Sequence, residues 1–176
     1  MIYNSFYGYA MAICKRYSSN HADAVEMLNE GFLKMFRKIQ HFTPGNGDFV
    51  NSFQNWFRHI FVYSAIEYFK KSYTYEATSD AENLVYSFPL EIEYSEQELD
   101  PQRTIEAMQD LSPISRMVFN LFVIEGLGHD EIASQLSIST SISQMNLSYA
   151  RNYLQNRLFG QNNFPIEVAV KRSAGR

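Results

Sequence analysis

The stretch IEGLGHDEIASQLSISTSISQMNLSYARNYL, Ile124 to Leu154, predicts a helix, a tight turn and a second helix. In the first helix, expected from about Asp130 to Leu136, apolar residues recur at the three-to-four spacing that builds one buried face. Ser139 suits the N-cap of the second helix, because its hydroxyl can accept an amide proton that the first turn leaves unpaired. Small Ala133 lies where the helices would cross at roughly 90–120°. The pattern favours a helix-turn-helix, although helix pairs without a nucleic-acid role share it.

The first part of the chain predicts three more helices. The first runs from Tyr3 to Tyr17, the second follows the cap residue Asn20 to about Ile39, and the third runs from about Phe53 to Lys71. A Pro and two Gly in the loop Thr43 to Gly47 separate the second helix from the third. The buried side of the second helix is expected to carry Val25, Leu28, Phe32, Met35 and Phe36.

Two further helices are expected before the helix-turn-helix. Asp100-Pro101 opens one through about Asp110, and Ser112-Pro113 opens another through Ile124, because Pro is tolerated at a first helical position. The buried stripe of the last helix is expected to include Leu147, Ala150, Leu154 and Leu158. The fold class is therefore all-α: a three-helix domain at 1–72 and a four-helix domain at 100–160, with a linker at 73–99 and a tail at 161–176.

The charge is unevenly distributed, although the whole chain carries a net −4. Residues 1–72 have eight basic and five acidic side chains, whereas 73–99 have seven acidic and no Lys or Arg. Residues 100–160 carry four basic and six acidic groups, and 161–176 carry three and one. The acidic segment lacks a long helical period and reads as a flexible linker, which either mimics nucleic acid in a basic channel or serves solubility alone.

No motif in the sequence indicates an enzyme, a metal site or a cofactor. The single Cys14 cannot form an intramolecular disulfide and is expected to be a core thiol, which suits a reducing cytoplasm. No apolar run approaches the ~20 residues of a membrane span, so we expect a soluble protein. His129-Asp130-Glu131 resembles a catalytic group but is better explained as partners of a helix N-terminus. A dinuclear metal site at Glu26 and Glu30 would need Glu-x-x-His partners, which are absent.

Most of the chain outside the linker and tail resembles the bacterial RNA polymerase sigma factors of the extracytoplasmic-function (ECF) type. The resembling segments are DAVEMLNEGFLKMFRKIQHF (Asp23 to Phe42), SFQNWFRHIFVYSAIEYFKK (Ser52 to Lys71), LSPISRMVFNLFVIEGLGHDEIASQLSIS (Leu111 to Ser139) and Leu147 to Arg151. The resemblance implies a promoter-melting domain followed by a domain for the minus-thirty-five element. It also implies three partners: core RNA polymerase, promoter DNA and an anti-sigma factor.

The resemblance assigns three sets of contact residues. Polymerase contact falls on the second helix, at Asp23, Glu26, Asn29, Glu30 and Phe32. Minus-ten recognition and melting fall on Asn46, Phe53, Trp56, Arg58, His59 and Tyr63, where aromatic rings beside cations suit separated strands. Major-groove contact at the minus-thirty-five element falls on Thr140, Ser141, Gln144, Met145, Ser148, Tyr149 and Arg151.

Several residues depart from the family pattern. Tyr63 stands where Asn is common and Glu67 where Asp is common. Gln144, Asn146 and Tyr149 occupy positions that are usually basic, which predicts weak DNA binding with a shallow salt dependence. Ser137 replaces a frequent turn Gly, at a cost of about 1 kcal/mol if the site needs a positive φ. Polar Ser143 takes a usually aliphatic core position.

These observations predict an alternative sigma factor that binds core polymerase, directs it to promoters and helps open the duplex. A second hypothesis is a sigma-like module that sequesters polymerase or an anti-sigma factor without reading promoters, which the poorly basic recognition helix motivates. A dimeric helix-turn-helix repressor is a third hypothesis. A hydrolase that uses His129 is the fourth.

Overall fold

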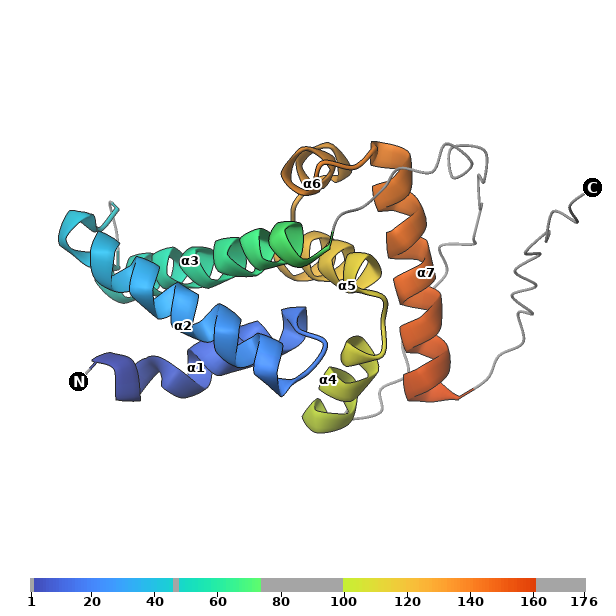
Figure 1. Cartoon of the computed structure of the whole chain (residues 1–176), viewed down its shortest axis with the longest axis horizontal. Coiled ribbons are helices and arrows are strands. Elements are labelled where there is room, and N and C mark those ends of the chain that lie inside the picture. Colours follow the sequence, from blue (N-terminus) through green and yellow to red (C-terminus); the bar gives the residue numbers. More distant parts are fainter. Residues whose placement is uncertain (1, 46–47, 74–99, 161–176) are drawn as a thin grey trace, which may run out of the picture.

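The computed structural model describes residues 2–45, 48–73 and 100–160, and the regular structure of these ranges is helical (Figure 1). The predicted all-α fold class is confirmed. The predicted tail, Asn46 and all of the linker except Tyr73 lie outside the described residues. None of the described helices is both long and apolar enough to cross a membrane.

The first part of the chain forms the three expected helices. They are α1 (Ile2–Tyr17), α2 (His21–Lys38), which continues into a short 3-10 turn (Ile39–His41), and α3 (Phe49–Ser72). Asn20 caps α2 as predicted, because its Oδ1 accepts the Asp23 N–H at 2.9 Å. Helix α3 begins earlier than expected, since Asp48 supplies the cap: its Oδ1 accepts the Val50 N–H at 2.9 Å.

The second part holds α4 (Pro101–Gln109), α5 (Pro113–Phe119), α6 (His129–Leu136) and α7 (Thr140–Phe159). Both predicted Pro starts are confirmed, with Asp100 and Ser112 as the N-caps. The helix expected to run from Pro113 to Ile124 is divided, because its last five residues, Asn120–Ile124, form a π-helical turn. Gly126 then adopts a φ of 74° and ends it.

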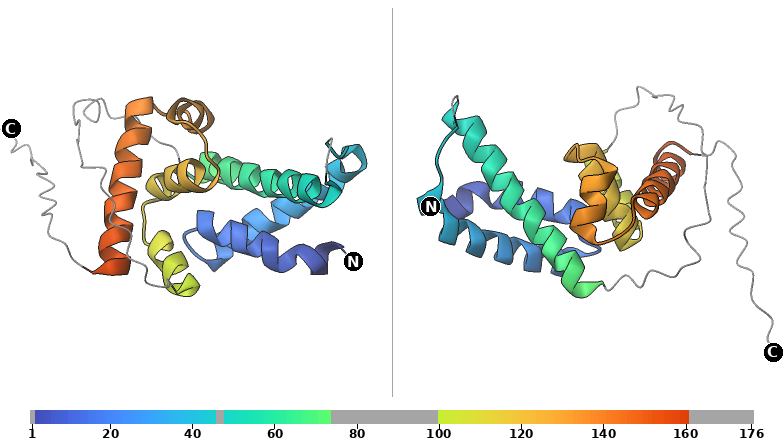
Figure 2. Two further views of the ribbon diagram at one scale, coloured as in Figure 1. Left: turned by 180° about the vertical axis from the view of Figure 1, so that it is seen from behind. Right: turned by 90° about the horizontal axis from the view of Figure 1, so that it is seen from above.

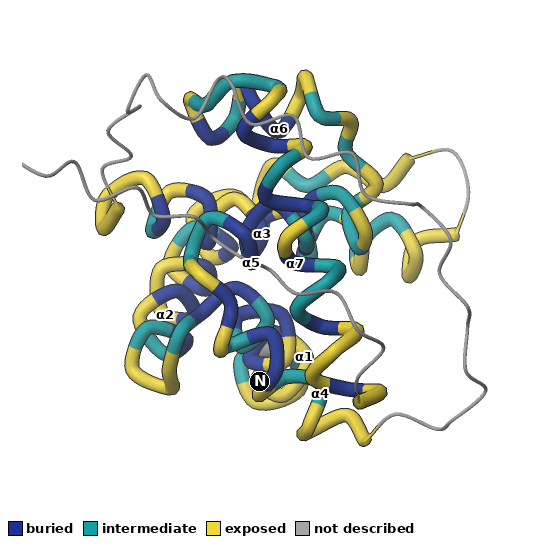
Figure 3. The backbone as a smooth tube through the Cα atoms, turned by 90° about the vertical axis from the view of Figure 1, so that its right-hand side faces the viewer, coloured by how far each residue is buried: buried dark blue, intermediate teal, exposed yellow. Residues whose placement is uncertain are grey.

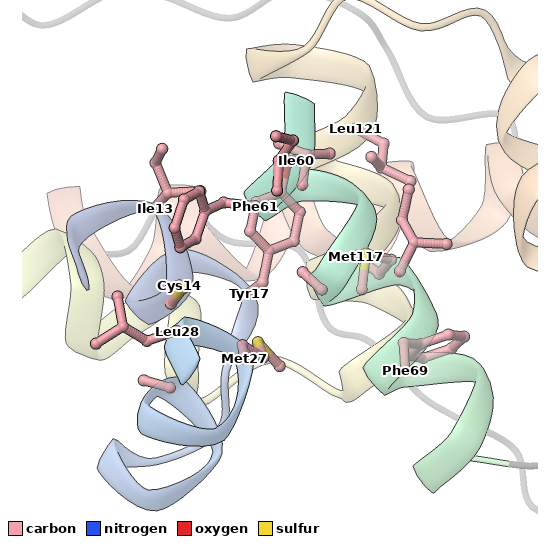
Figure 4. Close-up of a cluster of buried hydrophobic side chains, with 14 of the residues drawn as sticks. Ile13, Cys14, Tyr17, Met27, Leu28, Ile60, Phe61, Phe69, Met117 and Leu121 are labelled. Atoms are coloured by element: carbon pink, nitrogen blue, oxygen red, sulfur yellow. The ribbon is translucent and has the colours of Figure 1, made fainter. Parts of the chain in front are cut away.

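The main apolar core is shared by both parts of the chain. Phe61 of α3 and Leu28 of α2 belong to the same buried cluster as Met117 of α5 and Leu121 of the π-helical turn (Figure 4). The predicted core thiol Cys14 also lies in it, and desolvation raises the pKa of that thiol to about 12. A smaller cluster joins α4 to α7, and it contains Ala107, Met108, Leu111, Ala150, Leu154 and Leu158. The buried parts of the helices lie toward the inside of the molecule and the exposed parts on its outside (Figure 3).

The two helical parts are therefore packed against each other rather than joined by the chain alone. Helices α4 and α5 contact α1, and α6 contacts α3. Helix α7 forms the outer edge of the C-terminal part, on the side away from α2 (Figure 2). The helical periodicity predicted each stripe of core residues but contained no sign that one core would serve both parts.

Candidate nucleic-acid interface

One face of α2 is exposed to solvent and combines polar with apolar side chains. Glu26, Asn29 and Glu30, which were predicted to contact a partner, are exposed on it. Asp23 is different, because it is half-buried and accepts hydrogen bonds from Tyr68 Oη at 2.8 Å and Asn20 Nδ2 at 3.1 Å. Burial and this carboxylate raise the pKa of Tyr68 to about 12. Asp23 therefore braces α2 against α3 and leaves fewer lone pairs for a partner.

The assignment of Phe32 to the contact set is wrong, because its side chain is only 3 % exposed. Its ring packs 4.5 Å from that of Tyr3 and 5.2 Å from that of Phe61, measured between centroids. The apolar residues that α2 does expose are Leu33, at 50 %, and Phe36, at 49 %. Phe36 was expected on the buried side, so that expectation is also wrong. Together with Glu26, Asn29 and Glu30 these two residues define what we call the α2 stripe.

A cluster of aromatic rings surrounds the N-terminal end of α3. Phe42 lies 5.0 Å from Trp56 and 5.6 Å from Phe53, and Phe49 stacks on Phe53 at 6.4 Å. Phe53 and Trp56 are half-buried, whereas Phe49 is 59 % exposed. Phe42 and Phe49 were not among the predicted site residues, because the helix was expected to begin after them. The four rings, which we call the aromatic cluster, offer planar faces at the N-terminal end of α3.

The predicted residues farther along α3 separate into two groups. His59 and Tyr63 are exposed, one turn apart. Arg58 instead faces the C-terminal part: its Nε lies 2.9 Å from Glu125 Oε2, and its Nη2 donates to the Ile124 carbonyl at 2.8 Å. The hydrogen bond to Glu125 raises the pKa of Arg58 above its ordinary value. In this arrangement the Arg58 guanidinium is engaged within the protein and is unavailable to DNA.

Glu67, the other departure on α3, has a partner of opposite charge. Its Oε2 lies 2.6 Å from Lys34 Nζ, which also donates to Ser64 Oγ at 3.3 Å. The longer Glu side chain is thus used to tie α3 to α2. Because Glu67 is largely exposed, this pair contributes little to stability.

The outer face of α7 carries the residues predicted to enter a major groove. Ser141, Gln144 and Tyr149 are exposed, and Met145 and Ser148 are half-buried. Thr140 Oγ1 donates to Asp130 Oδ1 at 3.0 Å, which ties the start of α7 to the start of α6. Arg151 leans over the Phe122 ring, with its guanidinium carbon 5.5 Å from the centroid. The face is polar, with one half-buried cation at its far end.

The inner face of the helix-turn-helix explains two of the polar departures. Ser143 is fully buried, and its Oγ lies 2.9 Å from His129 Nδ1, while the His129 ring stacks on Phe122 at 4.5 Å. Asn146 is also buried: it accepts from Ser115 Oγ at 2.7 Å and donates to the Ile142 carbonyl at 2.9 Å. Asn146 therefore points into the protein interior and does not lie on the outer face of α7.

The turn and the start of α6 match the expectations made for them. Ser137 adopts a φ of 57° and a ψ of 46°, so the site does need the left-handed conformation that Gly adopts without strain. Ser139 caps α7 as predicted, accepting the Ile142 N–H at 3.2 Å. At the start of α6, Glu131 Oε2 accepts the Gly128 N–H at 2.8 Å, as expected for a capping acid. The side chain of His129 packs on Phe122 rather than capping the helix.

Comparison with known proteins agrees with this geometry. The family model described as sigma-70 region 2 matches residues 2–73, and the model described as sigma-70 region 4 matches residues 102–154. Among curated proteins, none matches the sequence well enough to support a family assignment.

Among solved structures, the chain is similar in fold to the sigma factor RpoE in complex with the anti-sigma factor NepR from Bartonella quintana. The alignment has 19 % identity and a TM-score of 0.50, and it covers 91 % of this chain and 96 % of that one. The two family models together span the aromatic cluster, the α2 stripe and the outer face of α7. The chain belongs to the sigma-70 family of sigma factors, with regions 2 and 4 arranged in the two-part organisation of the ECF type.

Proposed function

We propose that this sigma factor binds core RNA polymerase, directs it to a class of promoters and assists in opening the duplex. The observation that carries the proposal is the aromatic cluster, which is partly exposed and lies within the segment that matches region 2. The proposed division of labour follows the predicted domains, with residues 1–72 for polymerase and the minus-ten element and 100–160 for the minus-thirty-five element.

The α2 stripe is the proposed contact with core polymerase. Two exposed apolar side chains beside three polar ones fit a protein partner, because buried apolar area supplies affinity and the polar rim supplies specificity. Leu33 and Phe36 replace Phe32 in the proposed contact set, since a ring that is nearly inaccessible cannot reach a partner. Asp23 stays in the set because the residue is only half-buried.

The aromatic cluster is the proposed holder of an unpaired strand. Stacking of a base on an aromatic side chain contributes roughly 1–3 kcal/mol, and it is available only after the base leaves the duplex. Phe49 is best placed for this because its ring is exposed. The exposed polar groups of His59 and Tyr63 lie farther along the same helix. Binding energy that appears only in the separated state favours melting without any catalytic group in the sigma factor itself.

Helix α7 is the proposed reader of the minus-thirty-five element. Its exposed Ser141, Gln144 and Tyr149 can hydrogen-bond base edges, but the described α7 carries only Arg151 and Arg157 as basic side chains. Arg157 lies 3.6 Å from Asp110 and is partly neutralised. Few cations mean few released counterions, so affinity for free DNA is expected to be low and tethering to polymerase to supply the rest.

Run-off transcription with the purified chain, core polymerase and a genomic fragment library of the source organism tests the proposal. Discrete start sites are expected. On an identified promoter, Phe49→Ala should lower the initiation rate about tenfold through the lost stacking energy. Phe159→Ala, which removes an exposed ring from the end of α7, is the matched control and should leave the rate unchanged. Equal rates for the two variants would contradict the role of the aromatic cluster.

A sequestering module is the second candidate, and the weakly basic α7 face is the observation that favours it. An anti-sigma partner is proposed because the similar RpoE was solved with one. We place the protein in the cytoplasm, where polymerase acts. Polymerase binding without start sites in the same assay would favour sequestration, and absence of polymerase binding would remove both candidates.

A further inference from the structure

Three side chains from three separate elements meet at the far end of the outer face of α7. Phe122 belongs to the π-helical turn, His129 is the first residue of α6, and Arg151 lies in α7. The His129 ring stacks on the Phe122 ring, with 4.5 Å between centroids and 27° between planes. The guanidinium carbon of Arg151 lies 5.5 Å from the centroid of the same Phe122 ring. Phe122 is therefore a common support for an imidazole and a cation.

Both rings of this group are fixed by contacts with the interior of the protein. Phe122 is half-buried and packs against the main apolar core. His129 Nδ1 lies 2.9 Å from the Oγ of Ser143, a residue of α7 that has no exposed surface. Burial and, to a smaller degree, the charge of Arg151 lower the pKa of His129. The imidazole is therefore mainly neutral at pH 7 and does not repel the guanidinium.

Arg151 differs from Arg58 and Arg157 because its hydrogen-bond donors are unused. The side chain is half-buried, yet among the described residues it forms neither an ion pair nor a hydrogen bond. Arg157, by contrast, lies 3.6 Å from Asp110, and Arg58 is engaged by Glu125. A cation–π contact uses the charge of a guanidinium but not its N–H groups, so these stay available to an anion.

The place of Arg151 along α7 favours a phosphate over a base as its acceptor. In the helix-turn-helix motif, the N-terminal residues of the recognition helix contact base edges. Arg151 follows Thr140, the first residue of α7, by eleven positions, which is about 16 Å at 1.5 Å per residue. The major groove is about 12 Å wide. The guanidinium therefore falls at the edge of the groove, where the phosphates lie.

We propose that Phe122 and His129 are positioning residues, which hold the Arg151 guanidinium in place for a phosphate beside the minus-thirty-five element. The inference rests on the proposed function, and it assigns a role to two residues that do not touch DNA themselves. His129 also ties this support to α7 through Ser143, about two helical turns before Arg151. The support and the cation are therefore attached to the same helix, the one that is proposed to read the DNA.

A single positioned cation has a large effect here because α7 has few basic residues. A free arginine side chain loses much rotamer freedom when it binds, whereas one that is already held by a ring loses less. Each phosphate contact steepens the log–log dependence of affinity on salt by about 0.9. Helix α7 has only Arg151 and Arg157 as basic residues, and Arg157 is partly neutralised. Loss of the Arg151 contact should therefore remove most of the salt dependence that α7 contributes.

Fluorescence anisotropy of an identified promoter duplex, with the full chain bound to core polymerase, tests the inference over a series of salt concentrations. Phe122→Leu and His129→Ala should each make the log–log slope shallower, toward the loss of about 0.9 expected of Arg151→Ala. In Phe122→Leu/Arg151→Ala the slope should change no further than in Arg151→Ala, since the ring acts only through the cation. The matched control Phe119→Leu alters a half-buried ring one turn earlier and should leave the slope unchanged. Loss of folded protein would lower binding at every salt concentration but would not change the slope.

NMR relaxation of the arginine side-chain nitrogens measures the positioning directly in the free chain, without DNA or polymerase. The Arg151 Nε–Hε group should be more ordered than that of exposed Arg37 in α2, and Phe122→Leu should lower its order to the Arg37 value. Equal order for the two arginines in the unaltered chain would overturn the inference. So would an unchanged slope in Phe122→Leu or Arg151→Ala, or an equal change in Phe119→Leu. Run-off transcription separates the two proposals. Start sites with unchanged slopes would count against the inference alone, whereas an Arg151 ordered by Phe122 without start sites would count against the proposed function alone.

Discussion

Replacing serine by glycine is expected to have opposite effects on stability at two nearby sites, one in the turn between α6 and α7 and one within α6. Ser137 is the one described non-glycine residue with a positive φ, at 57°. It follows α6 directly, and the next N–H, that of Ile138, donates to the Ala133 carbonyl at 3.1 Å. This is a helix end of the kind that Gly usually occupies. Ser134, by contrast, is exposed inside α6.

The magnitudes follow from backbone energetics. The left-handed conformation costs an L-residue about 1–2 kcal/mol, and Gly loses about 0.5–1 kcal/mol more backbone entropy on folding than other residues do. Ser137→Gly should therefore raise the free energy of unfolding by about 0.5–1 kcal/mol. Ser134→Gly has only the entropic loss and should lower it by about 0.5 kcal/mol. For a chain of this size the midpoints should move about 1–4 °C up and 1–2 °C down, respectively.

Thermal unfolding followed by circular dichroism, with both variants in the same buffer, measures the two shifts. Because both substitutions remove the same hydroxymethyl group from an exposed site, their difference isolates the backbone conformation. A fall in midpoint for Ser137→Gly would refute the reasoning, since the strain at this turn would then not exist in solution. A rise for both variants would show that loss of the serine side chain, and not φ, is responsible.

Three further predictions concern the core, the DNA face and pH. Phe32→Ala should lower the free energy of unfolding by about 3–5 kcal/mol, whereas Phe36→Ala should change it by less than about 0.5 kcal/mol and weaken pull-down by core polymerase. Equal losses in urea unfolding would contradict the burial of these rings. Gln144→Lys should steepen the salt dependence of promoter binding, measured by fluorescence anisotropy, by about 0.9 in log–log slope, and the exposed control Gln102→Lys should leave it unchanged. A steeper slope for both would remove α7 as the DNA face. Burial and the charge of Arg151 lower the pKa of His129 from 6.5, so the unfolded chain binds the proton more readily. The free energy of unfolding should therefore fall as pH drops below about 6.5, and His129→Gln should reduce that fall; an identical pH profile for the variant would exclude His129 as its source.

The helix starts were predictable from sequence because their causes are local. Asn20, Asp100, Ser112 and Ser139 each accept an amide proton two or three residues ahead, so the residue type and its position suffice. The start of α3 was predicted too late, at Phe53, although its cause is equally local: Asp48 lies directly before the helix and accepts the Val50 N–H.

The side chains whose roles were misjudged are those whose neighbours come from distant segments. Phe36 shares helical spacing with the core residues of α2, but it lies at the edge of their buried face, where no other helix of the described residues covers it. Ser143 was interpreted as a polar residue in a usually aliphatic core position. Its hydrogen-bond partner, His129, lies on the other helix of the pair and could not be identified from the sequence. Periodicity gives the direction of a side chain around its own axis, and it cannot say which directions the rest of the chain will cover.

Two features of the sequence are explained by the contact between the two helical parts. Helix α1 ends at Tyr17 without the Gly that commonly terminates a helix, so its last carbonyls needed donors from elsewhere. Arg116 stands in the run PISRMVF, at a position that helical spacing makes internal, which marks a buried cation in need of acceptors. Arg116 supplies a donor to the chain at the end of α1, and the carbonyl there supplies an acceptor to the buried cation. Arg116 donates to the Ser18 carbonyl at 2.6 Å and to the Gln109 carbonyl at 3.2 Å, and helical periodicity within α1 or α5 cannot predict such pairings between distant segments.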